Sequence, residues 1–530
     1  MPLPVAATLG PAFRGSTVSA VIGDEGVVEA QLQLLVDEGI VEPAPTAGTY
    51  RFRHALMRDA AYETQVLDVR RNTHAAVADV MLATGREPAL VAAHLDLAGM
   101  DVRAAGLYVV AAQASQARGA HTEATQLLSR ALVLYEAMPA SQERDLGELG
   151  ARMLRVFSVS SMRGYAAPEV ESDHDRAEAL AEGLGNRPEV LPSVVGIYAY
   201  RLTNGDVPTA QGLTERLLAM TSRPEFSWFQ PEVDDCAGFA QLYQGHLEAA
   251  QGFLQRSVEG FAARTSEEDV VSPYWPLPND PVAAAKIGLA CVAALRGEPL
   301  TAARWERDAV QRAESVGFPR GPFTVGFVKT YAAWIRQFRG EDEAARALGA
   351  DVVSIGQKHG YAYWVVLGSA YVGGPPGAAP DRVFLENCVG TLRLMGHEAF
   401  LASVLQSLAL MTARAGDLER SYELINDAFQ VAHKTGEMLH VPEILRHRAS
   451  FSLRRGGDAA ETVADLVAAV EVATEQGARV SRLRAALDLA RLPDEHRPKD
   501  WTALLAAART DLPEAFTSTE TETADLLLDR

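Results

Sequence analysis

The sequence predicts an all-α protein: an α-solenoid of stacked helical hairpins, each about 40 residues long, preceded by a small module of helices and strands. Three observations support this fold class. A glycine followed by a polar residue and a new helix recurs along the chain, and apolar side chains before these glycines follow a helical period. The apolar residues are also mostly Ala, Leu and Val, while aromatic residues make up only 7%.

Residues 1–75 are expected to form the mixed module. The segment "EGVVEAQLQLLVDEGIV" has the apolar period of an amphipathic helix. The next segment, "IVEPAPTAGTYRFRH", alternates as a β-hairpin, with Tyr50 and Phe52 facing inward and Arg51 and Arg53 outward. Another helix follows. Helix, hairpin and helix are the plan of a winged-helix module, which we expect to be truncated at its N-terminus.

Residues 76–492 are predicted to form the solenoid. The repeated pattern begins at Gly119, Gly205, Gly245, Gly297, Gly340, Gly416 and Gly457. The intervals between these glycines are 86, 40, 52, 43, 76 and 41 residues, so the two longest are close to doubled periods. The pattern indicates tetratricopeptide-like hairpins that are somewhat longer than the usual 34 residues, with some degenerate copies.

Aromatic residues take part in the apolar stripe before Gly340. Phe327, Tyr331, Trp334 and Phe338 fall on one helical face. Side chains at this spacing usually pack in the core, and we expect that here. Lining of a ligand pocket is the alternative.

Three proline-containing stretches, residues 222–235, 272–281 and 373–382, are predicted to be loops between hairpins, because proline prevents helix continuation. Aromatic residues in the first two stretches either cap the ends of hairpins or contact a partner on the concave face of the solenoid. The candidate partner-binding residues are Trp228, Phe229, Tyr274 and Trp275. Residues 493–530 are expected to form a C-terminal helix and an acidic, partly disordered tail.

Composition excludes several classes of protein. The formal net charge is -20, which argues against a protein that coats nucleic acid or an anionic membrane. Three widely spaced cysteines predict neither disulfides nor a zinc site. The N-terminus has no signal-peptide pattern, and no run of eighteen apolar residues is present. We therefore expect a cytoplasmic protein without a membrane span.

Enzyme motifs are missing from the sequence. No Gly-Lys dipeptide occurs, so there is no P-loop to hold nucleotide phosphates. "HEAFL" at His397 lacks the second histidine of a zinc protease motif, and no G-x-S-x-G elbow is present. We find no segment with the strands of an adenylate cyclase. The sequence predicts a protein that is not an enzyme and holds no metal or cofactor of its own.

Several strings together resemble a known family. "YRFRHALMRDAAYE", "LYVVAAQASQARGAHTEATQLLSRALVLYE" and "RGYAAPEVESDHDRAEALAEGLG", followed by "VPEILRHRASFSLRRGGD", resemble the C-terminal half of large actinobacterial STAND-type regulators. In that family a signalling ATPase, with an adenylate cyclase domain or a LuxR-type context, accompanies a tetratricopeptide-like array. The resemblance spans about residues 1–492 and implies that the ATPase domain would lie upstream of this chain.

The same resemblance gives His54 a role. In STAND ATPases a histidine of the winged-helix module contacts a nucleotide phosphate, and "FRHALMRD" fits that context loosely, with Ala55 where an acidic residue often stands. His54 would act only with an ATPase domain present. The alternative is a hydrogen-bonded histidine at a strand–helix junction.

The neighbouring arginines Arg51, Arg53 and Arg58 have three interpretations: an interface with the ATPase domain, a solvated face, or contacts with DNA phosphates. We favour the first. The leading hypothesis is a non-catalytic sensor or scaffold of a signalling ATPase or adenylate cyclase-type regulator. It would bind a protein or small effector on the concave face and need an ATPase or cyclase domain in cis or in trans. The alternative is a DNA-associated transcriptional regulator acting through the winged helix.

Overall fold

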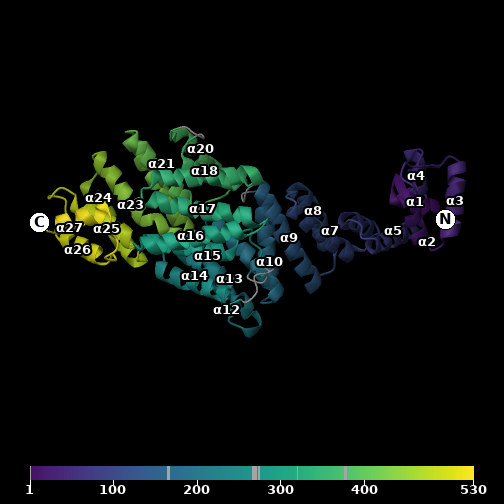
Figure 1. Cartoon of the computed structure of the whole chain (residues 1–530), viewed down its shortest axis with the longest axis horizontal. Coiled ribbons are helices and arrows are strands. Elements are labelled where there is room, and N and C mark those ends of the chain that lie inside the picture. The colour runs from purple at the N-terminus through teal and green to yellow at the C-terminus, as the bar shows by residue number, and fades with distance from the viewer. Residues whose placement is uncertain are drawn as a thin grey trace. The chain divides into compact units, whose positions relative to one another are not determined.

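The computed structural model describes residues 2–163, 167–264, 271–272, 275–318, 320–374 and 379–529. It is 77% helical, with 27 α-helices among the described residues, which confirms the predicted helical-repeat fold class. The chain divides into two compact units, Met1–Ser158 (unit 1) and Val159–Arg530 (unit 2). Figure 1 shows the successive helices of each unit.

Unit 1 begins with a small mixed module. Its elements are α1 (Pro2–Leu9), β1 (Ala12–Arg14), α2 (Gly15–Ile22), α3 (Glu25–Asp37), β2 (Val41–Pro43), β3 (Thr49–Phe52) and α4 (Ala55–Glu63). The strands form an antiparallel sheet in the order β1-β3-β2. The predicted hairpin is present: Phe52 pairs with Val41 and is buried, and Arg51 is exposed. Strand β1 was not predicted, because three residues are too short to show an alternating pattern.

The rest of unit 1 is helical. Its helices are α5 (Leu67–Ala83), α6 (Pro88–Leu97), α7 (Asp101–Ala117), α8 (His121–Ala137) and α9 (Gln142–Arg163), which extends to the start of unit 2. Two core clusters stabilise the unit. One joins the sheet to α1, α2 and α3 and reaches Val77, and the other runs from Ala78 to Ala151. The two clusters therefore meet within α5.

Unit 2 consists of helical hairpins. Its α-helices are α10 (Pro168–Leu184), α11 (Leu191–Thr203), α12 (Val207–Thr221), α13 (Gln230–Tyr243), α14 (Leu247–Ala262), α15 (Pro281–Leu295), α16 (Pro299–Ser315), α17 (Arg320–Phe338), α18 (Asp342–His359), α19 (Ala362–Val372), α20 (Arg382–Leu394), α21 (Leu401–Arg414), α22 (Leu418–Thr435), α23 (Val441–Arg454), α24 (Ala459–Gln476), α25 (Arg479–Ala490), α26 (Trp501–Thr510) and α27 (Thr519–Leu528). Three short 3₁₀ helices, η1 (Pro188–Val190), η2 (Pro224–Phe229) and η3 (Met438–His440), precede α11, α13 and α23.

The predicted repeat matches these hairpins. The turns at Gly205, Gly245, Gly297, Gly340 and Gly416 each join two helices of a hairpin in unit 2. The 76-residue interval contains one more hairpin, α19 and α20, and the 86-residue interval contains α9 and α10. Each of the two long intervals therefore spans two repeats, one of them degenerate, as the spacing predicted.

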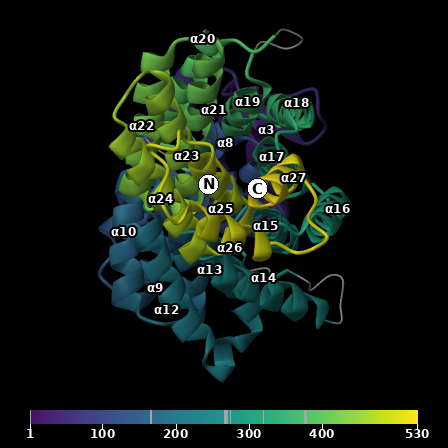
Figure 2. The ribbon, with the colours of Figure 1, turned by 90° about the vertical axis from the view of Figure 1, so that its left-hand side faces the viewer.

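The array of unit 2 winds back on itself. The carbonyl oxygen of Thr203 accepts hydrogen bonds from the backbone N–H groups of Glu398 and Ala399, both at 3.1 Å. A Cβ at Gly245 would lie 2.6 Å from Gln476, so this glycine both adopts a positive φ and lets the later hairpin approach. Figure 2 shows the result: α15, α17, α23 and α25 lie inside, and α16, α18, α22 and α24 lie outside.

Aromatic side chains fill much of the interior of this winding. The rings of Phe239 and Tyr331 are 5.6 Å apart, and those of Tyr331 and Phe400 are 5.0 Å apart. Tyr243 and Tyr331 share a hydrogen bond between their hydroxyls at 2.9 Å. The predicted core role of the aromatic stripe is confirmed for Tyr331, which is 5% exposed. The inner face of the array is thus largely packed.

One loop prediction was wrong, and the C-terminal tail contains a helix. The stretch 222–235 was predicted to be a loop, but α13 begins at Gln230, because Pro231 lies in its first turn where no N–H bond is lost. The C-terminal tail was predicted to be partly disordered, but it forms α27. The Ser518 side chain accepts a hydrogen bond from the N–H of Thr521, and the Thr521 hydroxyl accepts one from the N–H of Ser518.

Candidate ligand pocket

Unit 2 contains a pocket of about 500 Å³. Its lining comes mainly from α17, α18, α19, α21, α23, α25 and α27. The volume is in the range of small-molecule binding sites, which combine apolar walls with a few polar groups. The apolar part of the lining includes Leu295, Trp334, Phe338, Tyr371, Leu410, Met411 and Leu439. Trp334 and Phe338 of the predicted aromatic stripe therefore line a pocket as well as packing in the core.

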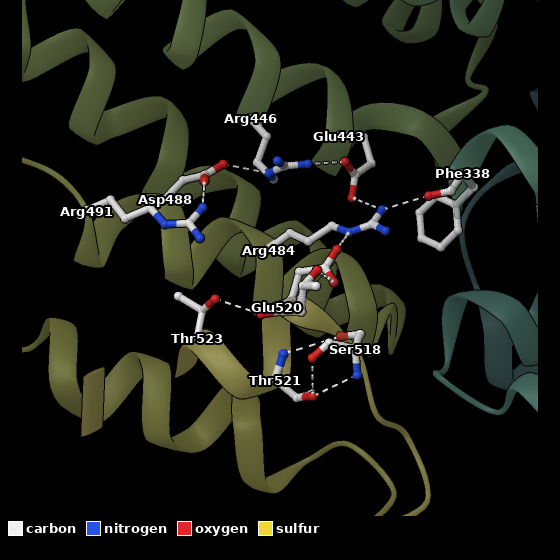
Figure 3. A network of polar contacts seen from close by, with 11 residues as sticks. Phe338, Glu443, Arg446, Arg484, Asp488, Arg491, Ser518, Glu520, Thr521 and Thr523 are labelled. Carbon is white, nitrogen blue, oxygen red and sulfur yellow. Dashed lines mark hydrogen bonds and ion pairs between the residues drawn. The ribbon is translucent and has the colours of Figure 1, made fainter. Parts of the chain in front are cut away.

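Charged residues of α23 and α25 form one side of this pocket, and we name Glu443, Arg446 and Arg484 the floor cluster (Figure 3). Glu443 and Arg446 are three residues apart on α23, so both project from the same helical face and form an ion pair. Arg446 also donates from Nε to Oδ2 of Asp488, at 2.7 Å. Glu443 and Arg446 are therefore both matched within the array.

Arg484 reaches across the pocket. It donates from Nη1 to the carbonyl oxygen of Phe338, at 3.0 Å, and from Nε to Oε1 of Glu520, at 3.2 Å. Its guanidinium carbon lies 4.7 Å from the centre of the Phe338 ring. Its Nη1 is 3.6 Å from Oε1 of Glu443. Figure 3 shows these side chains converging from four elements, so the floor cluster joins α17, α23, α25 and α27.

Electrostatics keep the floor cluster ionised. Burial alone would raise the pKa of Glu443, but Arg446 and Arg484 lower it to about 2. Burial and the nearby Arg446 lower the pKa of His447 to about 3, so this histidine is neutral at physiological pH. Its Nδ1 is 2.9 Å from Nε2 of Gln406. The floor thus offers two permanent cations beside one permanent anion.

Tyr371 of α19 has a polar group without a partner in the described part of the molecule. The Tyr371 side chain lines the pocket and is 7% exposed, and its hydroxyl has no hydrogen-bond partner among the described residues. A buried hydroxyl without a partner is costly, so such groups are often reserved for a ligand. The Tyr371 hydroxyl is therefore an unsatisfied group enclosed behind the pocket lining.

The lining as a whole has an excess of positive charge. Five arginines face three carboxylates, and these eight residues are Arg339, Arg346, Arg414, Arg446, Arg484, Asp342, Glu443 and Glu520. Asp488 and Glu341 pair with Arg446 and Arg339 from outside the lining, so the region is close to neutral once these two are counted. Arg346 has no ion-pair partner in the part of the chain that the structure describes.

The sequence did not predict this pocket. Its signal lies within "VPEILRHRAS", where Glu443, Arg446 and His447 occupy positions i, i+3 and i+4 among buried apolar neighbours such as Ile444 and Leu445. Three ionisable residues on a buried helix are unusual and often mark a functional site. Arg484 and Glu520 are too distant in sequence to be recognised as their partners.

The predicted residues of the N-terminal module lie elsewhere, in unit 1. His54 immediately precedes α4, its side chain is exposed, and it makes no capping hydrogen bond. Arg51 donates from Nε to Oε1 of Glu42 at 2.6 Å, and Nε of Arg53 is 3.7 Å from Oε2 of the same carboxylate. Arg58 pairs with the adjacent Asp59. Each of the three predicted arginines therefore lies within ion-pair distance of a carboxylate.

The predicted aromatic partner-binding residues differ in their exposure. Phe229 is fully buried and Trp275 is 4% exposed, so neither presents a surface to a partner. Trp275 donates its indole N–H to the carbonyl oxygen of Asn279, at 2.8 Å. Trp228 is 41% exposed. Tyr274 lies outside the described residues, so Trp228 and Tyr274 remain predicted partner-binding residues.

Other kinds of site were sought in the described part of the chain. It contains no group of three or more His, Cys, Asp or Glu side chains that could hold a metal ion. Within the same residues, no helix is both long and apolar enough to cross a bilayer.

Comparison with known proteins gives distant similarities. No protein-family model matches the chain. A curated, uncharacterised protein of Rhizobium meliloti (strain 1021) is 23% identical over 498 residues, which is 83% of this chain. The chain spans 43% of the length of that relative.

Solved structures with similar repeats have low TM-scores. The STAND protein with a tetratricopeptide repeat sensor from Pyrococcus horikoshii has a TM-score of 0.38 at 10% identity, covering 88% of this chain and 61% of its own. The Cut9–Hcn1 assembly of the APC/C has 0.45 at 12% identity, covering 97% and 92%. A Rap protein complexed with competence and sporulation factor has 0.42 at 9% identity, covering 77% and 96%.

Proposed function

We propose that this chain is the non-catalytic, effector-sensing part of a cytoplasmic signalling regulator of the STAND type. The repeat array of unit 2 binds a small effector in the pocket above the floor cluster. The N-terminal module, as a winged helix, connects the array to an ATPase or cyclase domain in cis or in trans. The observation that supports this function is a pocket of about 500 Å³ with both apolar walls and ionised side chains.

Two further features support a sensor. The floor cluster joins α17 to α27, so a ligand that touches Arg484 contacts hairpins more than 140 residues apart in sequence, as in the bond from Arg484 to Phe338 with a separation of 146. The sequence also lacks a P-loop, so nucleotide chemistry would belong to the partner domain.

The exposed pairing of Arg51 and Arg53 with Glu42 supports an interface over DNA binding, because a shared carboxylate offsets the charge that DNA phosphates would need. His54, exposed at the start of α4, is the residue we propose to face a nucleotide held by the ATPase domain. Trp228 is proposed as a contact for a protein partner.

The test is ligand-dependent stabilisation of the full chain. A ligand raises the melting temperature of a protein that it binds, so a collection of small acids, amines, amides and short peptides is screened by thermal shift. Ser407→Trp places a large side chain in the pocket lining and should abolish the response, whereas Ser315→Trp on the exposed face of α16 should retain it. An identical response from both variants, or ATP hydrolysis by this chain alone, would contradict the proposal.

A further inference from the structure

Glu520 differs from Glu443, the other pocket carboxylate near Arg484, in how firmly it is held. The Glu443 side chain is 12% exposed and pairs with Arg446, a residue of its own helix. The Glu520 side chain is 32% exposed, and among the basic side chains that the structure describes it pairs only with Arg484. Both carboxylates approach the guanidinium of Arg484. Glu443 is buried, whereas Glu520 is accessible.

The position of Glu520 depends on a short helix. The reciprocal hydrogen bonds between Ser518 and Thr521 set the first turn of α27, which places Glu520 toward Arg484 (Figure 3). On the far side of α27, Arg509 of α26 pairs with Asp525 at 2.8 Å. A ten-residue helix is only marginally stable by itself, so α27 depends on these polar contacts and on the packing of Ala524, Leu527 and Leu528 against the core.

We propose that the pocket binds a small carboxylate with an apolar body, and that Glu520 occupies the place of the ligand's carboxylate on Arg484 until the ligand displaces it. This inference rests on the proposed function and names its class of ligand. The charge paired with Arg484 stays the same, because one carboxylate replaces another on a guanidinium whose planar N–H groups suit carboxylate geometry. A partly exposed ion pair contributes little stability, so the exchange costs little.

The remaining pocket groups fit the same ligand. Trp334, Leu410 and Met411 provide apolar walls for the body. A cationic ligand would place its charge beside Arg446 and Arg484, which is unfavourable. A multiply charged phosphate would add uncompensated negative charge to a region that is close to neutral.

The experiment measures binding of ω-phenylalkanoates, with two to eight methylenes, to the full chain by calorimetry. The corresponding amides have the same shape without the charge. We expect at least one acid to bind wild type about tenfold more tightly than its amide. Glu520→Gln should tighten binding of that acid by about tenfold, if Glu520 occupies Arg484 roughly nine-tenths of the time. Glu522→Gln, an exposed carboxylate two residues along α27, should leave the affinity unchanged.

Each other outcome overturns the inference. Equal binding of acid and amide would show that the pocket does not select a carboxylate. Equal affinities for wild type and Glu520→Gln would show that Glu520 does not compete with the ligand for Arg484. Failure of every acid to bind Glu520→Gln would also contradict the inference. The proposed function stands separately: a ligand of another class that stabilises wild type but not Ser407→Trp supports a sensor pocket while excluding this ligand class. Because Glu520 is partly exposed, its substitution leaves folding intact, and the melting temperature of Glu520→Gln checks this.

Discussion

Two of the buried charge clusters in unit 2 differ in whether they border a pocket. The floor cluster borders a pocket. The second cluster, which we name the loop cluster, consists of Glu232, Arg264, Asp280 and Arg312, none of which lines that pocket. Glu232 accepts two bonds from Arg264, both at 2.7 Å, and one from the N–H of Ser272 at 3.0 Å. Buried ion pairs alone therefore indicate structure, and an adjoining cavity with apolar walls is what indicates a site.

The largest effect should come from breaking the loop cluster. Glu232→Ala leaves Arg264 without its buried partner, and such a change typically lowers the free energy of unfolding by about 3–5 kcal/mol. Urea denaturation of the full chain measures this loss. Glu225→Ala, at an exposed carboxylate in η2, is the matched control and should change stability by less than about 0.5 kcal/mol. A ligand affinity altered by Glu232→Ala in the folded protein would contradict the separation of the two clusters.

Glu443→Gln should have a slightly smaller effect that depends on pH. The folded-state pKa of Glu443 is lowered to about 2, so the carboxylate contributes stability that is present above its ordinary pKa of 4.5 and lost as pH falls toward 2. The variant should lose about 3 kcal/mol at pH 7, by the size of this shift, and should show a flatter decline in stability between pH 4.5 and 2. Stability curves for wild type and variant that stay parallel over this range would disprove the assignment.

Asp235 lies beside the loop cluster. The stability that it contributes should change with pH in the opposite direction to that of Glu443. Burial, Asp280 and Glu232 raise its pKa well above 3.8, and its Oδ1 has no hydrogen-bond partner in the described structure. A raised carboxyl pKa favours folding below pH 3.8, and that contribution is lost as pH rises toward the folded-state pKa. Asp235→Asn should therefore raise stability at pH 7 by about 1 kcal/mol and lose this advantage near pH 4. Thermal denaturation of wild type and Asp235→Asn at pH 7 and near pH 4 measures this difference in stability.

The sequence predicted the fold better than it predicted the site. The solenoid could be inferred because its glycine turns and helical stripes are local patterns that recur. The return of the array onto itself could not, since the contact of Gly245 with Gln476 joins residues with no common local pattern. The pocket depends on the same long-range winding: Phe338, Glu443, Arg484 and Glu520 meet only after it forms. His54 and its neighbouring arginines were recognised because they lie within one short segment.

The segment that holds His54 and its neighbouring arginines carries exposed charges, unlike the two buried clusters. Substitution of these arginines should have the smallest effect on stability. The Arg51 and Arg53 side chains are 59% and 57% exposed, and both lie beside Glu42. Exposed pairs of this kind contribute about 0–1 kcal/mol, so Arg51→Ala combined with Arg53→Ala should barely change the melting temperature. If these arginines instead form an interface, the double variant should weaken binding of a cognate ATPase domain, measured by calorimetry, while retaining the fold. Substitution of Arg103, an exposed arginine that pairs with Asp79 in the same unit, is the control that should leave such binding unchanged. An equal loss of affinity for DNA in a mobility-shift assay at low salt would instead indicate that the charges serve nucleic acid.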